Sequence, residues 1–588
     1  MCWTSLCKGF RWPWSLQEDQ SMLSLSMCWF YSYLTMISSY NAITQREIVM
    51  MRFMNTIMEK PEWNRKVFDG EITAKWRNEI AQSGQDVSPK MIDWILKEVE
   101  WKAKILKDTG FVTVMDAGVV KSDTAIPEEV QRALKDAVKP LEDVPKDQKD
   151  YHPGSDDLVV DLVHPSLFPV VYGKTRILAG SSIGLGNCLY HMGLGSLVPI
   201  PPKEDLGPPM PDPSSFSFYM PTDYRSERLY SPKFQWLPCE VKLLEGGDCQ
   251  IVSYINNAHP VQHKALYEVV EKVISRTLPL WEKTLSEPPN PRIDYCEVEY
   301  AEHPDPEPEP LSDEEDFDEE EFWDRHQQWR ETEPIILPEP GDFVIPKEAG
   351  KLNIRQHFPD TNLQVIVKLA NIELTPEKPN YDGGSWHIEG QLNERICATA
   401  LYYYDNENIT ENTLDFRKRA VIDEEIRYGQ SRHEFLQAVF GFGDDVDGFG
   451  GRNTTQHLGG VLCKEGRLLT FPNTLQHRVS SFSLADPSKP GHRKILALFL
   501  VDPHRRVISS ANVPPQNEKW AQDKQGLVNQ ALSQLPAELQ SMVGENLGSS
   551  MTMEEAKKFR LELMEERGIR SVTANKEYEE GDFSLCEH

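Results

Sequence analysis

A histidine and a glutamate two positions apart precede a strand-like run in the C-terminal half of the chain. His387 and Glu389 stand just before the β-branched and aromatic segment 396–404. On an extended backbone, residues i and i+2 project to the same face, so a ring nitrogen and a carboxylate oxygen can bind one ion there. His477 follows a second strand-and-turn pattern and is the candidate third ligand. Two histidines and one carboxylate form the facial triad of non-haem Fe(II) oxygenases, which leaves positions open for co-substrate and O₂.

An arginine downstream of the three candidate ligands offers a site for an anion. Arg493 opens the largely apolar run 494–501, sixteen residues after His477. A guanidinium at the end of such a strand needs a planar anion, and 2-oxoglutarate offers its distal carboxylate. Other residues compete for these two roles: His433, His457 and His492 for the distal metal ligand, and Arg505 and Arg506 for the anion contact.

The elements that must position these residues are short strands bounded by turns. The strongest strand patterns lie at 363–367, 396–404, 467–471 and 494–501. The interval 411–458 has a helical, charged character and includes a Gly-rich stretch that suits a loop. This organisation predicts that the candidate ligands stand at strand ends and turns of a β-rich core.

Residues from about 360 to 510 resemble the catalytic double-stranded β-helix of Fe(II)/2-oxoglutarate oxygenases, and their rhythm is similar to that of prolyl hydroxylases. The resemblance rests on the H-x-E motif, a strand with paired tyrosines, a Gly-Gly-x-Leu segment at 459–462, a Gly-Arg-Leu-Leu strand, the distal histidine and an Arg-led strand. It implies Fe(II) as the metal and 2-oxoglutarate as co-substrate. The residues implied to bind them are His387, Glu389 and His477 for the metal, and Arg493 and Tyr403 for the co-substrate.

Two features separate the chain from these families. Prolyl hydroxylases usually carry aspartate where this chain has Glu389, which leaves halogenase-like or inactive outcomes open. The segments around Trp386 and 470–472 are similar to Jumonji-type demethylases, which bind the co-substrate with a lysine shortly after the first histidine. The corresponding stretch 395–405 contains no lysine. Arg493 therefore favours the hydroxylase-like arrangement.

Residues 150–515 as a whole resemble a fungal family known as a domain of unknown function, DUF4246. The resemblance rests on phrases such as those at 161–167 and 253–257. The family name implies no activity. It does not distinguish among the functions considered below.

The predicted fold class is α+β, with a jelly-roll core between a helical N-terminal region and an exposed helical tail. Five regions are expected along the chain: a helical N-terminal region at 1–150, a β-rich region with a support helix at 151–300 that belongs to the core, an acidic disordered insertion at 301–335, the oxygenase-like jelly roll at 336–515, and the tail at 516–588.

The acidic insertion has a composition that disfavours burial. Between residues 302 and 333 there are fifteen acidic residues against two arginines, and prolines alternate with acids at its start. Such a segment cannot offset its ordering entropy by burying apolar surface, so it is expected to be a solvated loop. The alternative is a docking segment for a basic partner.

The charge and cysteine content restrict partners and compartment. The 62 Lys and Arg against 92 Asp and Glu give a net charge of −30, which repels phosphate backbones and anionic lipids. We therefore expect no nucleic acid partner. Ten cysteines without a C-x-x-C pair favour a reducing compartment, the cytoplasm or nucleus. The uncharged segment 21–45 contains many serines, so a helix packed on the body is expected rather than a signal anchor.

The function favoured by these observations is an Fe(II)- and 2-oxoglutarate-dependent dioxygenase that uses O₂ to hydroxylate or demethylate an unidentified substrate, either a small molecule or a protein. Two alternatives stay open. One is a non-catalytic interaction protein built on a degenerate β-helix. The other is a cupin-type metalloprotein that does not use 2-oxoglutarate.

Overall fold

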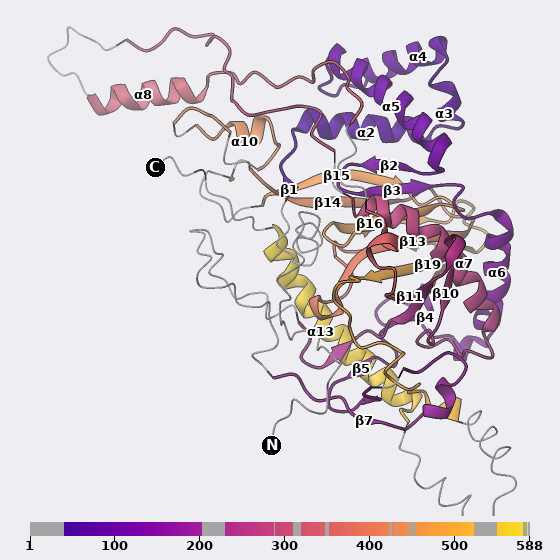
Figure 1. Cartoon of the computed structure of the whole chain (residues 1–588). Helices are drawn as coiled ribbons and strands as arrows, with labels where there is room; N and C mark the ends of the chain where they lie inside the picture. Colours follow the sequence, from indigo (N-terminus) through magenta and orange to yellow (C-terminus); the bar gives the residue numbers. More distant parts are fainter. Residues whose placement is uncertain are drawn as a thin grey trace, which may run out of the picture.

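The protein mixes antiparallel sheets with helices that lie towards both ends of the chain (Figure 1). The computed structural model describes residues 40–180, 182–202, 230–286, 289–309, 319–346, 352–422, 426–430, 432–443, 445–446, 453–521, 550–579 and 585. The predicted combination of helical and strand-rich regions is confirmed at this level. Among the described residues the strands form open sheets rather than a closed barrel.

The largest sheet has nine antiparallel strands in the order β10-β9-β11-β19-β13-β16-β3-β2, with β4 also paired to β11. Their bounds are β2 (Val112–Met115), β3 (Val119–Ser122), β4 (Val159–Val163), β9 (Cys239–Leu243), β10 (Cys249–Ile251), β11 (Leu363–Leu374), β13 (Ile396–Glu407), β16 (Leu468–Pro472) and β19 (Gly491–Val501). The three central strands, β11, β19 and β13, are buried along most of their length. Because both faces of these strands are buried, their sequences are nearly continuous apolar runs.

A smaller sheet faces the centre of the large one. It contains β1 (Tyr40–Asn41), β14 (Thr413–Val421), β15 (Thr455–Leu462) and β17 (Gln476–Val479), with β14 between β15 and β17. Its Phe416 meets Phe471 of β16 edge-on, with ring centroids 5.1 Å apart. Both rings belong to one apolar core with Phe499 of β19. The two sheets therefore pack face to face.

Three two-stranded pairs complete the β structure: β12 (Asn380–Tyr381) with β18 (Phe482–Ser483), β5 (Val170–Val171) with β8 (Phe234–Gln235), and β6 (Arg176–Ile177) with β7 (Ser196–Leu197). The first pair matters for the site because β12 precedes His387 and β18 follows His477. It brings the two chain segments that carry these histidines together.

Helices cover both faces of this framework. Their bounds are α2 (Gln45–Glu59), α3 (Trp63–Lys66), α4 (Gly70–Ala81), α5 (Pro89–Thr109), α6 (Glu128–Glu142), α7 (Lys264–Thr284), α8 (Glu319–Glu331), α9 (Ile354–His357), α10 (Phe435–Ala438) and α13 (Met553–Glu579). Short 3₁₀ turns lie at Lys146–Gln148, Cys188–His191, Glu245–Gly247, Leu392–Glu394 and Glu518–Trp520. Helices α6 and α7 pack on the face of the large sheet that points away from the small one.

Helix α5 shows how local sequence sets these boundaries. The Ser88 hydroxyl accepts a hydrogen bond from the backbone N–H of Met91, and Pro89 occupies the first turn, where its missing N–H costs no helical bond. Gly110 ends the helix with φ 80°, a left-handed conformation that suits glycine. Helix α5 packs on α2, so the predicted helical character of the N-terminal part holds here, although β2 and β3 join the large sheet.

Other sequence expectations have mixed outcomes. Residues 21–39 of the uncharged segment lie outside the described residues. Within the described part of the chain, no helix has both the length and the apolar character needed to cross a bilayer. Part of the acidic segment 301–335 is helical, because α8 spans Glu319–Glu331; residues 310–318 lie outside the described residues.

Candidate metal centre

The two candidate histidine ligands are joined through their backbones. The N–H of His387 donates to the carbonyl of His477 at 3.1 Å, and the N–H of His477 donates to the carbonyl of His387 at 3.0 Å. Their ring centroids are 4.4 Å apart. His477 is also paired in register with Phe416 across β17 and β14. Residues ninety positions apart in sequence therefore share one site.

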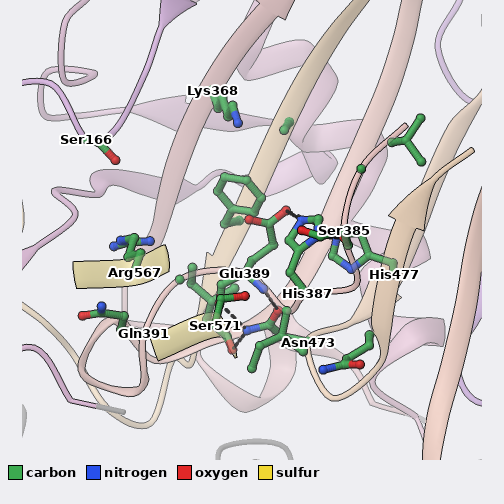
Figure 2. Close-up of a pocket in the computed structure, with 18 of the residues that line it drawn as sticks. Ser166, Lys368, Ser385, His387, Glu389, Gln391, Asn473, His477, Arg567 and Ser571 are labelled. Atoms are coloured by element: carbon green, nitrogen blue, oxygen red, sulfur yellow. Dashed lines mark hydrogen bonds and ion pairs between the residues drawn. The ribbon is translucent and has the colours of Figure 1, made fainter. Parts of the chain in front are cut away.

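Glu389 completes the group. Its Oε1 lies 3.4 Å from Nε2 of His477 and 3.9 Å from Nε2 of His387. The ligand atoms of all three residues lie within 4.8 Å of one another (Figure 2). Adjacent ligands bound at about 2.1 Å from a metal stand roughly 3 Å apart. The observed spacing is therefore close to that of a bound triad.

Asn473 holds the backbone of Glu389. Its side-chain oxygen accepts from the Glu389 N–H at 2.8 Å, and its amide nitrogen donates to the Glu389 carbonyl at 2.9 Å. The same nitrogen also donates to the carbonyl of Ile396 at the start of β13. A paired side chain that fixes a ligand in this way acts as an outer-shell support.

The tautomer of His387 suits metal binding. Its Nδ1 lies 2.8 Å from the Ser385 carbonyl and must carry the proton, which leaves the Nε2 lone pair facing Glu389. Gly383 permits the chain to reach this position: its φ is 95°, and a Cβ there would approach the Val479 carbonyl oxygen to 2.8 Å. Of the Gly-Gly pair before the motif, Gly383 is thus required by close backbone approach.

Electrostatics keep two ligands in their metal-binding protonation states. Burial, and then the nearby His477, lower the pKa of His387 to about 4. Burial alone would raise the pKa of Glu389, but the hydrogen bond with His477 and the charges of both histidines lower it to about 2. At neutral pH His387 is therefore neutral and Glu389 ionised, as metal binding requires.

A cavity of about 660 Å³ opens beside the three ligands. Its floor consists of alternate residues of the large sheet, including Lys368 and Ala370 of β11 and Arg493 and Ala497 of β19. Helix α13 supplies another wall through residues such as Ser571 and Asn575. This volume lies within the range of small-molecule sites.

Helix α13 is tied to the metal centre by polar contacts. The Asn575 side chain donates to the carbonyl of Trp386 at 2.8 Å and accepts from the Gln476 side chain at 2.8 Å. Trp386 and Gln476 each immediately precede a histidine ligand. Asn575 therefore bridges the two ligand segments. The predicted helix is present and part of its surface is exposed, as at Ile569 and Val572, but its cavity-side residues pair with the site.

Arg493 lies in the cavity wall and is 2% exposed. One of its terminal nitrogens donates to the Asn412 side-chain oxygen at 2.7 Å, and its guanidinium carbon lies 4.9 Å from the ring centroid of Phe482. Its Nε is buried and has no hydrogen-bond partner among the described residues. This buried cation thus has an amide partner but, among those residues, no carboxylate.

The structure does not place Tyr403 in the cavity wall. Its ring centroid lies 5.9 Å from the guanidinium carbon of Arg493, and its hydroxyl accepts from the Cys463 thiol at 3.3 Å. Tyr381 of β12, which was not singled out from the sequence, does line the cavity. Burial raises the pKa of Tyr381, and the charge of Arg493 opposes that shift. A tyrosine close before the H-x-E motif was the available signal.

The competing residues lie elsewhere. His492 pairs with Asp405 at 3.0 Å, and the His457 ring packs on Trp386 with centroids 5.4 Å apart. The His433 ring lies beside Tyr428, 5.6 Å away. None of these histidines lines the cavity, and neither does Arg505 or Arg506.

A second group, His152, Asp161 and His164, lies in or beside the same cavity and was not identified from the sequence. Its candidate ligand atoms also fall within 4.8 Å of one another. However, Nδ1 of His164 accepts the Ser166 N–H at 3.2 Å, so the ring proton is on Nε2, which then cannot bind a metal. Nδ1 of His152 is paired with Asp161 at 2.8 Å. This group is better suited to hydrogen bonding than to metal binding.

Comparisons with known proteins identify a family but no activity. The family described as "Protein of unknown function (DUF4246)" matches residues 89–524, and its N-terminal domain, described as "Domain of unknown function DUF4246, N-terminal", matches residues 9–79. No curated protein matches the chain.

Similarity to solved structures is slight. A BsmA homologue from Methylobium petroleophilum is 12% identical, with a TM-score of 0.14 over 24% of this chain and 42% of that one. IDO from Bacillus thuringiensis is 11% identical, with a TM-score of 0.13 over 24% and 46%. Procruciferin, an 11S globulin from Brassica napus, is 10% identical, with a TM-score of 0.11 over 40% and 49%. The chain spans less than half of each of these proteins.

Proposed function

This chain belongs to the DUF4246 family, and we propose that it is an Fe(II)- and 2-oxoglutarate-dependent oxygenase of the hydroxylase-like kind. The observation that carries the proposal is the convergence of His387, Glu389 and His477 on one cavity wall. Two imidazole nitrogens and one carboxylate oxygen from neighbouring positions form the donor set of a facial triad. The substrate and the outcome, hydroxylation or demethylation, are left open by this proposal.

The strand order supports a double-stranded β-helix as the core of the proposed enzyme. The central strands of the large sheet run β11-β19-β13-β16, and the facing strands pair as β15-β14-β17, with β12 and β18 alongside. Consecutive strands alternate between the two sheets for much of this region. A jelly roll formed in this way places the ends of β12 and β17 at one mouth, where the three ligands lie.

Arg493 supports 2-oxoglutarate as the co-substrate. A buried guanidinium without a carboxylate partner is costly unless an anion pairs with it. Its unpartnered Nε offers a donor to the distal carboxylate, and Tyr381, whose ring also packs on Phe482, brings a second polar group to the same cavity. A cupin-type metalloprotein that binds no 2-oxoglutarate would have no such use for Arg493.

Each of the remaining contacts has a role in this function. Fe(II) and 2-oxoglutarate, when bound, supply the activation of O₂ that oxidises a substrate C–H bond. Asn473 and Ser385 orient two ligands, and Asn575 holds the segments on either side. Helix α13 forms one wall of the cavity, and such a wall would help to keep water from a reactive site and so prevent side reactions.

Anaerobic titration of the full chain with Fe(II) and then 2-oxoglutarate tests the proposal. We expect a saturable metal-to-ligand charge-transfer band in the wild type, and its loss in His387→Ala and Glu389→Ala. Admission of O₂ should then produce succinate. Metal binding without any response to 2-oxoglutarate would support the cupin-type alternative. Absence of metal binding would support the interaction protein.

A further inference from the structure

The cavity is cationic in a protein that is strongly acidic overall. Among the described residues that line it, five are permanently basic and Glu389 is the only carboxylate. The basic set is Lys368, Arg395, Arg493, Arg567 and Arg570. Because the whole chain carries a net charge of −30, this local excess of positive charge is not a consequence of composition. It points to anionic ligands.

Two of these cations already have acidic partners outside the cavity wall. Arg567 pairs with Glu394 at 2.5 Å, and Arg570 pairs with Glu566 at 3.3 Å. Lys368 differs from them, because its ammonium group makes no hydrogen bond or ion pair with any described residue. Lys368 is half-buried on the cavity floor, where a lone ammonium group favours an incoming anion.

Lys368 and Arg493 stand at different levels of the sheet. Lys368 is in register with Ala497, and Arg493 is in register with Ile372, four residues farther along β11. At about 3.4 Å per residue, the two levels are about 14 Å apart along the strands. The four carbon–carbon bonds of 2-oxoglutarate, each about 1.5 Å, span at most about 6 Å. If Arg493 holds the co-substrate, Lys368 is left for a second anion.

Further donors line the same cavity. The charge of Lys368 acts on His164, whose ring proton is on Nε2, on the buried Asp161 beside His164, and on the candidate metal ligand Glu389. The Ser166 hydroxyl oxygen accepts from the indole N–H of Trp236 at 2.9 Å, so its own proton can be donated. Arg567 lies with its guanidinium carbon 3.7 Å from the centroid of the same Trp236 ring.

Figure 2 shows Ser166 and Arg567 on the side of the cavity away from His387 and His477, with Lys368 above Glu389. We propose that Lys368, His164, Ser166 and Arg567, the lysine subsite, bind an acidic group of the primary substrate while Arg493 holds 2-oxoglutarate. This inference rests on the proposed function. The substrate class is thus an anion, a carboxylic acid or a phosphate ester.

The test uses the full chain loaded with Co(II) under nitrogen, with and without saturating 2-oxoglutarate. Inorganic phosphate and ¹³C-labelled acetate are the probes, and broadening of their ³¹P and ¹³C lines by Co(II) is the readout. We expect saturable broadening by at least one probe with 2-oxoglutarate bound. Lys368→Met should weaken the binding of that probe at least tenfold and change 2-oxoglutarate affinity less than twofold. The probe bound more tightly distinguishes a phosphate from a carboxylate substrate.

Lys494→Met is the matched control, because Lys494 lies on the opposite face of β19 and pairs with Glu142 and Asp405. Lys494→Met should change neither the affinity for the probe nor that for 2-oxoglutarate. Lys368→Arg should retain most of the probe binding. Absence of saturable broadening in the wild type overturns the inference. So does a Lys368→Met protein that loses 2-oxoglutarate but keeps the probe, because Lys368 would then anchor the co-substrate. If the wild type binds no 2-oxoglutarate, the proposed function is wrong. Probe binding that depends on Lys368 in the absence of 2-oxoglutarate would still support the lysine subsite.

Discussion

Replacing Arg493 gives the sharpest test of how the cavity holds its co-substrate. The side chain is 2% exposed, donates to Asn412, and keeps an unpartnered Nε beside the cavity. Arg493→Ala removes the cation and its unpartnered Nε donor while leaving His387 and His477 in place. Arg493→Lys keeps a charge but loses the planar two-point fork. Metal affinity should be nearly the same in all three proteins.

The expected magnitude follows from the surroundings. Truncating one partner of a buried, hydrogen-bonded charge pair costs roughly 2–5 kcal/mol. Each 1.4 kcal/mol corresponds to a tenfold change in affinity, so the 2-oxoglutarate constant of Arg493→Ala should rise at least about thirtyfold. Arg493→Lys should fall between this value and the wild type. Loss of the Asn412 contact lowers stability as well, so melting temperatures must accompany the affinities.

The assay measures succinate release against 2-oxoglutarate concentration, and the anaerobic charge-transfer titration measures binding separately. Lys494→Met is the control, because it removes a neighbouring cation that is paired on the opposite face of the strand. An unchanged 2-oxoglutarate constant in Arg493→Ala, with folded protein and full metal occupancy, would refute the anchoring role. The distal carboxylate would then have to lie elsewhere, and the cupin-type alternative would gain weight.

Four further outcomes are expected. His387→Ala and His477→Ala should lose Fe(II) or Co(II) in equilibrium dialysis, whereas His457→Ala should retain it; full occupancy in His387→Ala would contradict the assignment. Asn473→Ala should weaken Co(II) binding about 10- to 100-fold, as loss of an outer-shell support does, and unaltered affinity would show that Glu389 needs no such support. Deleting 305–331 should leave the melting temperature and co-substrate turnover nearly unchanged, because the described contacts of α8 are mostly within that segment. A large loss of either would show that the segment stabilises the rest of the protein. The pKa of His387 is about 4 in the folded protein and about 6.5 in the unfolded chain, so its contribution to the stability of the apo-protein is complete above pH 6.5 and disappears as the pH falls towards 4. The urea midpoint should therefore fall as the pH is lowered from 6.5 to 4, and His387→Gln should reduce the dependence of the unfolding free energy on pH by up to one proton. An equal pH dependence in the variant would contradict the low pKa.

The candidate metal ligands were identifiable from sequence because their signals are local. His387 and Glu389 share a face through the two-residue period of an extended chain, and His477 follows a recognisable strand and turn. Their convergence depends on the backbone pairing between His387 and His477, which no local pattern encodes. Arg493 was identifiable because a charge at the start of an apolar strand is conspicuous.

Residues of the cavity floor and wall were harder to identify. Lys368 is one charge within the long apolar run of β11, and only the pairing of β11 with β19 shows that it shares a cavity with Arg493. Tyr403 and Tyr381 could not be separated by residue type, because the path of each strand decides which ring faces the cavity. The role of α13 was concealed because Asn575 makes polar contacts, whereas sequence periodicity reports apolar faces.

The position of α13 in the sequence affects how the site is completed during synthesis. About one hundred residues separate His477 from Tyr578, whose hydroxyl donates to the Thr474 carbonyl at 2.9 Å. At roughly 5–20 residues per second, a ribosome adds them in about 5 to 20 s. During that interval the nascent chain already contains its three candidate metal ligands but lacks the helix that forms one wall of the cavity beside them. Metal acquired then would be exposed to bulk solvent and oxidants, so loading after release of the chain is the safer order of maturation.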